Sequence, residues 1–568
     1  MTASISPANA APQASTRERK REGRKGRLVD PRALEEVQAL LGDASRQRDL
    51  LIEHLHKLQD RYGCLSAAHL AALAQEMRLA QTEVYEVATF YHHFDVVKEG
   101  GATPAAITVR VCDGLSCEMA GAADLLQRLP ALLGREIRVL ATPCVGRCAQ
   151  APIVVVGQNP VEHATPAAVV EATATHTLRH VQEPHIDYAA YKANGGYQLL
   201  QKYHAGKLGR EELLVTMEDS GLRGLGGAGF PSGRKWRIVG AEPAPRLMAV
   251  NLDEGEPGTF KDRHYLERDP HRFLEGMLIA AWAVDVAEIY IYLRDEYHGC
   301  RSLLEAELAK LRADPPVSDL PRIHMRRGAG AYICGEESAM IESIEGKRGM
   351  PRLRPPYVAQ VGLFGRPTLE HNFETLYWVR EIVEKGAAWY ASHGRHGRHG
   401  LRSFSVSGRV REPGVKLAPA GITMTELLDE YCGGMQDGHS FYAYLPGGAS
   451  GGILPASMAN IPLDFDTLQE YGCLIGSAGV IVLSDHDTAS GAARNMMRFF
   501  KHESCGQCTP CRNGTAKASG LMEQKKWNLG LLADLSGVMR DASICGLGQA
   551  APIPLDCVVK YFPHELVS

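Results

Sequence analysis

The spacing of apolar residues changes along the chain and separates regions with different expected structures. Over residues 29–100 apolar positions recur every three or four residues, as in segment 50–58, and this spacing predicts a small helical module. From Ile107 the pattern changes to short β-like runs around one helix at residues 121–133. Residues 101–185 are therefore expected to form a small α/β domain of the thioredoxin-like type.

The middle of the chain, residues 186–400, holds most of the glycine-rich segments and two strand candidates, RLMAVNLDE (246–254) and AEIYIYLRDE (287–296). Both strands end in acidic residues, which is typical of an open, Rossmann-like α/β sheet that binds a nucleotide at the carboxyl edge of its strands. The His-Gly repeat at residues 393–400 predicts a solvated linker, with a metal role for its three histidines as the alternative.

The last third of the chain changes pattern twice. Residues 401–488 combine short strand-like runs and turn signals with one helix, TMTELLDEY, and this combination predicts a β-grasp domain. Residues 489–568 carry amphipathic helical spacing interrupted by cysteines and predict a terminal helical bundle. Because 568 residues exceed what one hydrophobic core can organise, the expected fold class is a multi-domain α/β protein.

Composition excludes several classes of function. The net charge is −4 and basic residues are spread along the chain, so nucleic-acid binding is not expected. No apolar stretch reaches the roughly 18 to 20 residues of a membrane span. Residues 1–28 are rich in Ala, Ser and Pro followed by Arg and Lys, which predicts a disordered basic tail; a transit peptide and a tail lying on an acidic partner surface are the alternatives. A cytoplasmic location is expected.

The chain has fourteen cysteines, and eight of them fall into two tight groups, which favours metal binding over disulfides. In the C-terminal group, Cys505, Cys508 and Cys511 are spaced CxxCxxC, and 33 residues separate Cys511 from the fourth cysteine, Cys545. Three thiolates on one short loop with a distant fourth suit a [4Fe–4S] cubane. A Cys₄ zinc site is the alternative, although zinc sites usually pair two CxxC knuckles.

The N-terminal group consists of two pairs at the ends of predicted strands: Cys112 with Cys117, and Cys144 with Cys148. Two such pairs can each hold one iron of a [2Fe–2S] centre, and zinc is again the alternative. The remaining cysteines are expected to be buried small hydrophobic residues. They are Cys64, Cys300, Cys334, Cys432, Cys473 and Cys557.

Three loops in the predicted α/β domain have the composition of a nucleotide site. Loop 224–236 is dense in glycine and carries Lys235, so its backbone N–H groups and the lysine can cradle a phosphate. Loop 251–258 gathers Asn and acidic residues after a strand, and loop 328–337 enters a helix, whose N-terminus would favour an anion. A flexible glycine loop and a solvated acidic turn are the alternatives, and the spacing differs from the dinucleotide fingerprint.

Over residues 190–568 the chain resembles the flavoprotein that oxidises NADH in respiratory complex I and the diaphorase subunits of NAD-reducing hydrogenases and formate dehydrogenases. The resemblance rests on ESCGQCTPCRNG, AYICGEESAMIESIEG, PRLRPPY and HNFETL. Residues 30–185 resemble the [2Fe–2S] neighbour of that flavoprotein through EVYEVATFYHHF and the two cysteine pairs. Here both parts are fused in one chain.

The resemblance implies bound FMN and NAD(H). The FMN-binding residues it implies are Gly224, Gly226, Gly227, Lys235, Asn251, Asp253, Glu254, Gly335, Glu336, Asn372 and Thr375, with Glu337 beside the isoalloxazine. The rings of Phe230 and Tyr357 would sandwich the adenine, and Glu256 would lie near the adenosine ribose. A carboxylate there repels a 2′-phosphate, so NAD is preferred to NADP. Glu337 and Glu256 are the expected catalytic residues.

Two positions depart from the complex I pattern: Leu225 replaces an arginine, and His371 replaces an asparagine. Together with VCDGLSCEMAGA they resemble the formate dehydrogenase group. The expected function is a β subunit that passes electrons from a partner, through [4Fe–4S] and FMN, to NAD⁺. That partner would be an α subunit with a Mo or W pterin and further clusters. A hydrogenase diaphorase, a complex I module, and a non-catalytic iron–sulfur or zinc scaffold are the alternatives.

Overall fold

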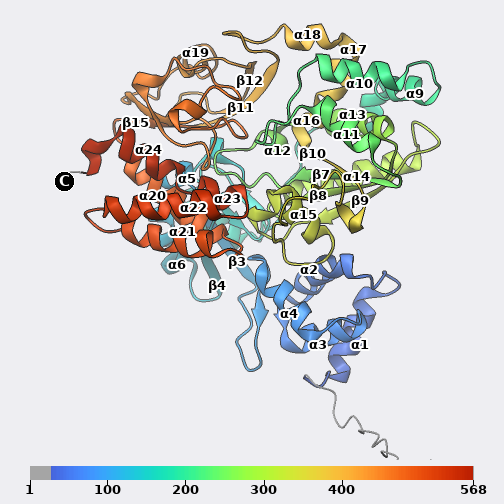
Figure 1. Ribbon diagram of the computed structural model, residues 1–568. Coiled ribbons are helices and arrows are strands. Elements are labelled where there is room, and N and C mark those ends of the chain that lie inside the picture. The colour runs from blue at the N-terminus through green and yellow to red at the C-terminus, as the bar shows by residue number, and fades with distance from the viewer. Residues whose placement is uncertain (1–26, 567–568) are drawn as a thin grey trace, which may run out of the picture.

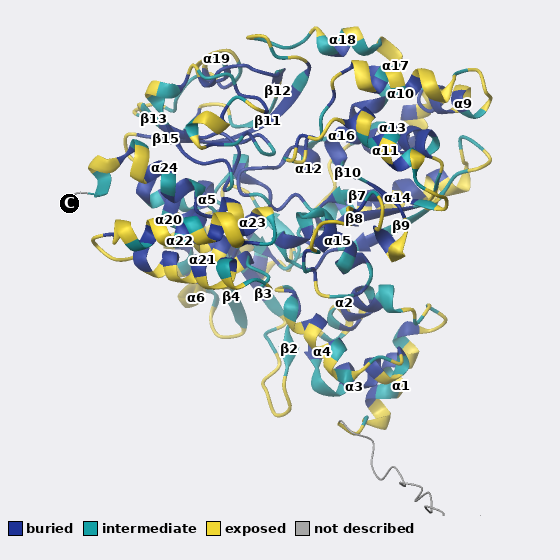
Figure 2. Cartoon of the chain, in the orientation of Figure 1, coloured by how far each residue is buried: buried dark blue, intermediate teal, exposed yellow. Residues whose placement is uncertain are grey.

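The computed structural model describes residues 27–566, so the basic tail predicted for residues 1–28 lies almost entirely outside the described part. Figure 1 shows the helical module at one end of the molecule, while the other domains pack together beside it. One buried core runs through the helical module, the α/β domain, the β-grasp domain and the bundle, and a second core fills the thioredoxin-like domain (Figure 2). No helix within residues 27–566 is long and apolar enough to cross a membrane.

The predicted helical module is present. Leu51, Leu55 and Leu58 of the 50–58 segment are fully buried along one face of their helix, as the apolar spacing requires. Asp30 caps the first helix by accepting a hydrogen bond from the Arg32 N–H at 2.8 Å. The elements are α1 (Pro31–Leu41), α2 (Leu51–Tyr62), α3 (Ala67–Glu76), α4 (Gln81–Phe90) and the short parallel pair β1 (Leu65–Ser66) and β2 (Val96–Val97).

The thioredoxin-like domain has a four-stranded sheet in the order β4-β3-β5-β6, with β3 and β4 parallel and the other pairs antiparallel. Because β3 and β4 end at the same edge, the two predicted cysteine pairs meet there: Cys112 ends β3, and Cys144 follows β4 by two residues. The elements are β3 (Ile107–Cys112), α5 (Leu115–Met119), α6 (Ala122–Leu133), β4 (Ile137–Thr142), β5 (Val154–Val156), β6 (Asn159–Val161) and α7 (Pro166–Ala174).

The α/β domain is built on an entirely parallel sheet in the order β10-β7-β8-β9, as predicted for a Rossmann-like arrangement. Its strands are β7 (Arg246–Leu252), β8 (Val286–Leu293), β9 (Arg322–Arg327) and β10 (Thr368–Asn372). Its helices are α8 (Tyr188–Ala193), α9 (Gln198–His204), α10 (Arg210–Asp219), α11 (Ser232–Ala241), α12 (Lys261–Leu266), α13 (Pro270–Val284), α14 (His298–Ala313), α15 (Glu337–Ile344), α16 (Phe373–Tyr377), α17 (Val379–Lys385) and α18 (Ala387–Ala391).

The β-grasp domain is a mixed sheet in the order β12-β11-β15-β13-β14, crossed by one helix whose N-terminus is closed by a capping box between Thr423 and Glu426. The elements are β11 (Leu401–Gly408), β12 (Gly414–Pro419), α19 (Met424–Tyr431), β13 (Phe441–Leu445), β14 (Leu454–Pro455) and β15 (Gly479–Ser484). The bundle follows with α20 (Ala489–Glu503), α21 (Thr509–Met522), α22 (Leu529–Ala542), α23 (Gly546–Ala550) and α24 (Ile553–Tyr561).

The His-Gly repeat at residues 393–400 connects α18 to β11 and is tied to α19. Arg395 pairs with Glu430 at 2.7 Å, and the His396 ring contacts Glu426 at 3.1 Å. Among the residues that the structure describes, its three histidines do not form a group with metal-ligand spacing. The segment is thus a connection held by ion pairs to the β-grasp helix.

Candidate functional site

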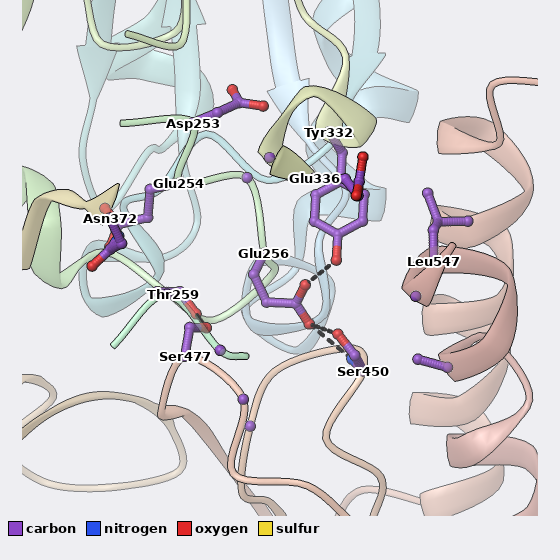
Figure 3. A pocket seen from close by; sticks show the side chains of 18 of the residues that line it. Asp253, Glu254, Glu256, Thr259, Tyr332, Glu336, Asn372, Ser450, Ser477 and Leu547 are labelled. Carbon is purple, nitrogen blue, oxygen red and sulfur yellow. Dashed lines mark hydrogen bonds between the residues drawn. The ribbon is translucent and has the colours of Figure 1, made fainter. Parts of the chain in front are cut away.

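A cavity of about 410 Å³ opens at the carboxyl edge of the parallel sheet, between the α/β domain, the β-grasp domain and the bundle (Figure 3). Its volume falls within the range of small-molecule sites. Nine of the predicted cofactor residues line it: Gly226, Gly227, Asn251, Asp253, Glu254, Glu256, Gly335, Glu336 and Asn372. The three predicted loops therefore share one cavity.

The loops meet because β7 and β10 are neighbouring strands. Asn251 and Asn372 are paired in register at the ends of these strands. The Asn251 side-chain amide donates to the Gly335 carbonyl at 2.9 Å, and its oxygen accepts from the Asp253 N–H at 3.0 Å. Asn251 thereby joins loop 251–258 to loop 328–337.

Close approach between backbone and ligand is built into the glycine loop. A Cβ on Gly226 would lie 2.9 Å from the Cβ of Asn372, and Gly227 has a φ of +125° that L side chains rarely adopt. Beside this loop, the Asp253 Oδ2 atom is buried without a hydrogen-bond partner in the described chain. Burial raises the pKa of Asp253 well above its ordinary value. A buried acceptor without a partner indicates that a ligand group belongs there, as FMN would provide.

Glu254 lines the cavity, but its carboxylate is engaged by the protein. It accepts hydrogen bonds from the N–H groups of Asp262 at 2.8 Å and Arg263 at 3.1 Å, and from the Tyr297 hydroxyl at 2.9 Å. Burial raises the pKa of Glu254 to about 7. Its geometry is that of a residue that fixes the cavity wall.

Glu256 projects into the cavity between the α/β domain and the β-grasp domain, as Figure 3 shows. Its Oε1 accepts from the Ser450 N–H at 2.8 Å and the Ser450 hydroxyl at 2.6 Å, and its Oε2 accepts from the Tyr332 hydroxyl. Burial raises the pKa of Glu256, and these hydrogen bonds oppose that rise. The partners of the Glu256 carboxylate lie on other loops, so this side chain joins loop 251–258 to the β-grasp domain and to loop 328–337.

Other predicted residues lie outside the cavity wall. The Lys235 Nζ donates to the Glu370 carbonyl at 3.0 Å, and the Thr375 hydroxyl accepts from the Leu225 N–H at 2.9 Å, so both stabilise the strand and loop behind the cavity. The Gly224 N–H donates to the Phe230 carbonyl at 2.9 Å within the glycine loop itself.

Glu336 and Glu337 begin α15. Glu336 lines the cavity and caps the helix by accepting from the Ala339 N–H at 2.9 Å. Glu337 pairs with Arg354 at 3.0 Å, and burial together with nearby Glu370 raises the pKa of Glu337. Phe230 and Tyr357 are 39% and 55% exposed and do not line the cavity, and the Arg234 guanidinium lies 5.8 Å from the centre of the Phe230 ring.

Several cavity residues were missed from the sequence. Lys261 is buried and pairs with Asp262 at 2.7 Å and Glu374 at 3.1 Å. Burial alone would lower the pKa of Lys261, but the two carboxylates raise it. Ser450 and Ser477 lie in turns whose sequence predicts only connections within the β-grasp domain. Tyr332 lies in loop 328–337, which was predicted to bind an anion, but Tyr332 itself was not singled out. The sequence did contain one signal for Lys261: it belongs to a charged segment, TFKDRH, that directly follows loop 251–258.

The C-terminal cysteines share a second, small cavity, lined by Cys505, Cys508, Cys511 and Cys545. Three of them come from the connection between α20 and α21 and the start of α21, and the fourth directly precedes α23. All four thiols are free. Ile333 and Leu547 line both this cavity and the large one, so a single layer of side chains separates the two. Four converging thiols fit a cubane cluster.

The N-terminal cysteines are also free and buried. The sulfur atoms of Cys144 and Cys148 are 3.2 Å apart, and both residues pack against Phe260 from the loop that follows Glu256. Buried Arg294 donates to the Cys144 carbonyl at 2.8 Å and also to the Glu254 carbonyl. This cysteine group is therefore attached to the cavity wall formed by loop 251–258.

Three protein families match the chain. "Nuo51 FMN-binding domain" matches residues 217–381, "Thioredoxin-like [2Fe-2S] ferredoxin" matches residues 37–176, and "NADH-ubiquinone oxidoreductase-F iron-sulfur binding region" matches residues 491–568. Over 407 residues the chain is 40% identical to the second F-type NADH-quinone oxidoreductase protein of Rhizobium meliloti, covering 69% of this chain and 96% of that protein. The chain belongs to the F-type family of NADH-quinone oxidoreductase proteins.

A second relative matches the F-type part, and a solved structure extends the likeness to most of the chain. "NADH dehydrogenase [ubiquinone] flavoprotein 1, mitochondrial" of Dictyostelium discoideum is 39% identical over 376 residues, which cover 63% of this chain and 78% of that protein. A crystal structure of an NAD⁺-reducing [NiFe]-hydrogenase in the H₂-reduced state contains a chain with a TM-score of 0.81 and 32% identity, covering 92% of this chain and 93% of that chain.

These matches confirm the predicted fold class and the predicted FMN and iron–sulfur groups for this F-type oxidoreductase. The FMN-binding match spans the three loops of the large cavity, and the two iron–sulfur matches span the two cysteine groups. The [2Fe–2S] match begins inside the helical module, so that family unit extends across residue 100.

The two positions that depart from the complex I pattern lie outside the cavity wall. Leu225 is buried, and its N–H is engaged by Thr375. His371 is 2% exposed and accepts from the Trp236 indole N–H at 2.7 Å. Burial and nearby Lys235 hold the pKa of His371 well below its usual range, so it is a neutral core residue.

Proposed function

We propose that the chain is the diaphorase component of an NAD-linked oxidoreductase, exchanging electrons between NAD(H) at the large cavity and a partner's redox centres. The shared wall of Ile333 and Leu547 supports this proposal, because the cavity lined by Cys505, Cys508, Cys511 and Cys545 adjoins the large cavity there. When bound, FMN exchanges a hydride with the nicotinamide and single electrons with iron–sulfur centres. The chain would therefore convert two-electron into one-electron transfer.

The chain's own residues bind and orient. We assign FMN binding to the predicted set, with two distinct contributions. Gly226, Gly227, Asn251, Asp253, Gly335, Glu336 and Asn372 line the cavity and offer direct contacts. Gly224, Lys235, Glu254 and Thr375 hold the loops in place through their bonds to the protein.

NAD(H) would enter from the open side of the same cavity. Phe230 and Tyr357 offer exposed rings for the adenine, and Glu337 lies near the flavin edge in the family arrangement. Glu256 is the residue that would meet the adenosine ribose, and its position on the cavity wall supports that role.

The partner is proposed to be a formate-oxidising α subunit with a Mo or W pterin and its own clusters, in the overall reaction formate + NAD⁺ → CO₂ + NADH. Leu225, His371 and the VCDGLSCEMAGA segment support this choice through their resemblance to the formate dehydrogenase group. A hydrogenase partner is the second candidate, since the likeness to the hydrogenase chain covers both fused parts of this one.

Two measurements test these assignments. The isolated chain should contain FMN and reduce ferricyanide with NADH, and an iron-replete preparation without FMN would contradict the diaphorase assignment. The co-purified complex should reduce NAD⁺ with formate. Reduction with H₂ but not with formate would transfer the assignment to a hydrogenase and leave the diaphorase role intact.

A further inference from the structure

Three metal-ligand side chains converge where the helical module meets the C-terminal bundle. His92 follows α4 by two residues, and His502 and Glu503 are the last two residues of α20. One donor atom from each lies within 4.8 Å of the others, and this is the one such group among residues 27–566. The cavity and the cysteine groups described above do not include these three residues as lining or ligand residues.

The donor atoms are available for a ligand. The two imidazole rings pack against each other with centroids 4.1 Å apart, at the meeting point of the two segments. Both histidines are exposed, which gives an ion access from solvent, whereas Glu503 is buried.

Glu503 is already held in place. Its Oε2 accepts from the Tyr332 N–H at 2.9 Å, which fixes the carboxylate and leaves Oε1 for a further partner. Such a hydrogen bond to a ligating carboxylate is a usual feature of metal sites in proteins. The hydrogen bond from Tyr332 therefore orients Glu503, which is the one buried residue of the three.

We propose that His92, His502 and Glu503 bind one divalent zinc-type cation. Two imidazoles and a carboxylate, with water as the fourth ligand, are a zinc ligand set, and Zn²⁺ accepts tetrahedral geometry without preference from its d electrons. Bonds of about 2.0 to 2.1 Å separate tetrahedral ligands by about 3.4 Å. The exposed histidines need only close the present separation, which is at most 4.8 Å.

Such an ion would connect parts of the protein that are far apart in sequence. His92 belongs to the segment after α4, and its backbone N–H contacts the Gly330 carbonyl at 3.4 Å. Glu503 contacts Tyr332, whose hydroxyl reaches Glu256 in the cavity. The ion would thus be attached at two points to loop 328–337 and should raise the thermal midpoint of unfolding.

The test uses the full chain with FMN and both clusters, stripped of loosely bound metal by a mild chelator and then titrated with Zn²⁺. One tight Zn²⁺ per chain is expected, with an X-ray absorption spectrum of nitrogen and oxygen ligands only. His92→Gln and His502→Gln should each weaken binding about 100-fold, since even the loss of a supporting residue costs 10- to 100-fold.

A matched control is His439→Gln. His439 and His486 also pack as a ring pair, with centroids 4.6 Å apart, but no third donor among the described residues completes a metal group there. This variant should bind Zn²⁺ as the unaltered chain does. The proposal would be overturned if the unaltered chain did not bind Zn²⁺ tightly, or if the His92 and His502 variants bound it as tightly as the unaltered chain does. Zn–S bonds of about 2.3 Å in the spectrum would also overturn it, because they would place the zinc on cysteines.

Discussion

Replacing Glu256 with Gln should shift coenzyme preference toward NADPH. The substitution removes the negative charge but retains the side-chain shape. The amide oxygen can still accept from the Ser450 N–H and hydroxyl, and the amide NH₂ can donate to the Tyr332 hydroxyl. The change therefore tests charge with little loss of structure.

The expected size follows from Coulomb's law. Two unit charges about 4 Å apart repel by ~1 kcal/mol in bulk water and by ~4 kcal/mol at the dielectric of a partly buried site. Glu256 is partly buried and lines an open cavity, so both limits apply. Removing the charge should raise kcat/KM for NADPH by about five- to a thousand-fold, and change that for NADH much less.

The assay is NADH- and NADPH-driven ferricyanide reduction by the isolated chain, with both specificity constants measured side by side. Tyr332→Phe is the matched control, because it removes one hydrogen bond from Glu256 but keeps the charge. This control should retain the NADH preference. If the ratio of kcat/KM for NADPH to kcat/KM for NADH were the same in Glu256→Gln as in the unaltered chain, this would falsify the selectivity role of Glu256.

The pH dependence gives an independent check of the same charge. Burial raises the pKa of Glu256, so the carboxyl becomes neutral at a higher pH than an ordinary glutamate. Below that pKa the repulsion is lost, and the NADPH/NADH ratio of the unaltered chain should rise as pH falls. The 2′-phosphate itself titrates at a pH of about 6. Subtracting the Glu256→Gln profile, which shares this phosphate effect, isolates the contribution of Glu256.

Three further substitutions test the remaining assignments. Cys508→Ser should remove the [4Fe–4S] electron paramagnetic resonance signal and leave the [2Fe–2S] signal; survival of both would disprove the ligand set. Gly226→Ala should lower FMN content, because the added methyl would lie 2.9 Å from Asn372, whereas Gly240→Ala has open space and should not. Lys261→Met leaves its two carboxylate partners buried and unpaired, and should lower the free energy of unfolding by about 3 to 5 kcal/mol in urea titration.

Local sequence patterns were sufficient for the elements and for part of the site. Strand β7 and loop 251–258 follow directly from an apolar run that ends in acidic residues, and the two cysteine groups follow from spacing alone. The resemblance then added the FMN residues of distant segments. Asn372 illustrates why it was needed, since its place beside Asn251 depends on β10 pairing with β7 across a long stretch of intervening chain.

The missed residues have a common physical reason. Ser450 and Ser477 lie in glycine-rich turns whose composition indicates a turn but says nothing about which cavity the turn will close. Their role arises only when the β-grasp domain packs against loop 251–258, where Ser450 contacts Glu256 and Ser477 contacts Thr259 at 2.7 Å. Lys261 is similar, because its buried charge is tolerated only with Asp262 and Glu374 in place.

The position of the [2Fe–2S] domain is fixed by polar contacts that are costly to break. Arg294 bridges the Cys144 and Glu254 carbonyls, Arg263 donates to the Gly146 carbonyl at 2.9 Å, and the Asn495 amide of α20 donates to the Asp113 carbonyl at 2.9 Å. Leaving a buried donor of this kind without its partner costs about 1 to 3 kcal/mol, and more where the donor is charged.

These contacts place the two cysteine groups on different walls of one cavity. The [4Fe–4S] group lies behind Ile333 and Leu547, and the [2Fe–2S] group lies behind Phe260 and loop 251–258. Because the anchoring contacts are buried and the two parts share one chain, the [2Fe–2S] domain stays beside the flavin cavity without relying on encounter between separate chains. The anchoring contacts therefore hold both cysteine groups beside the same cavity.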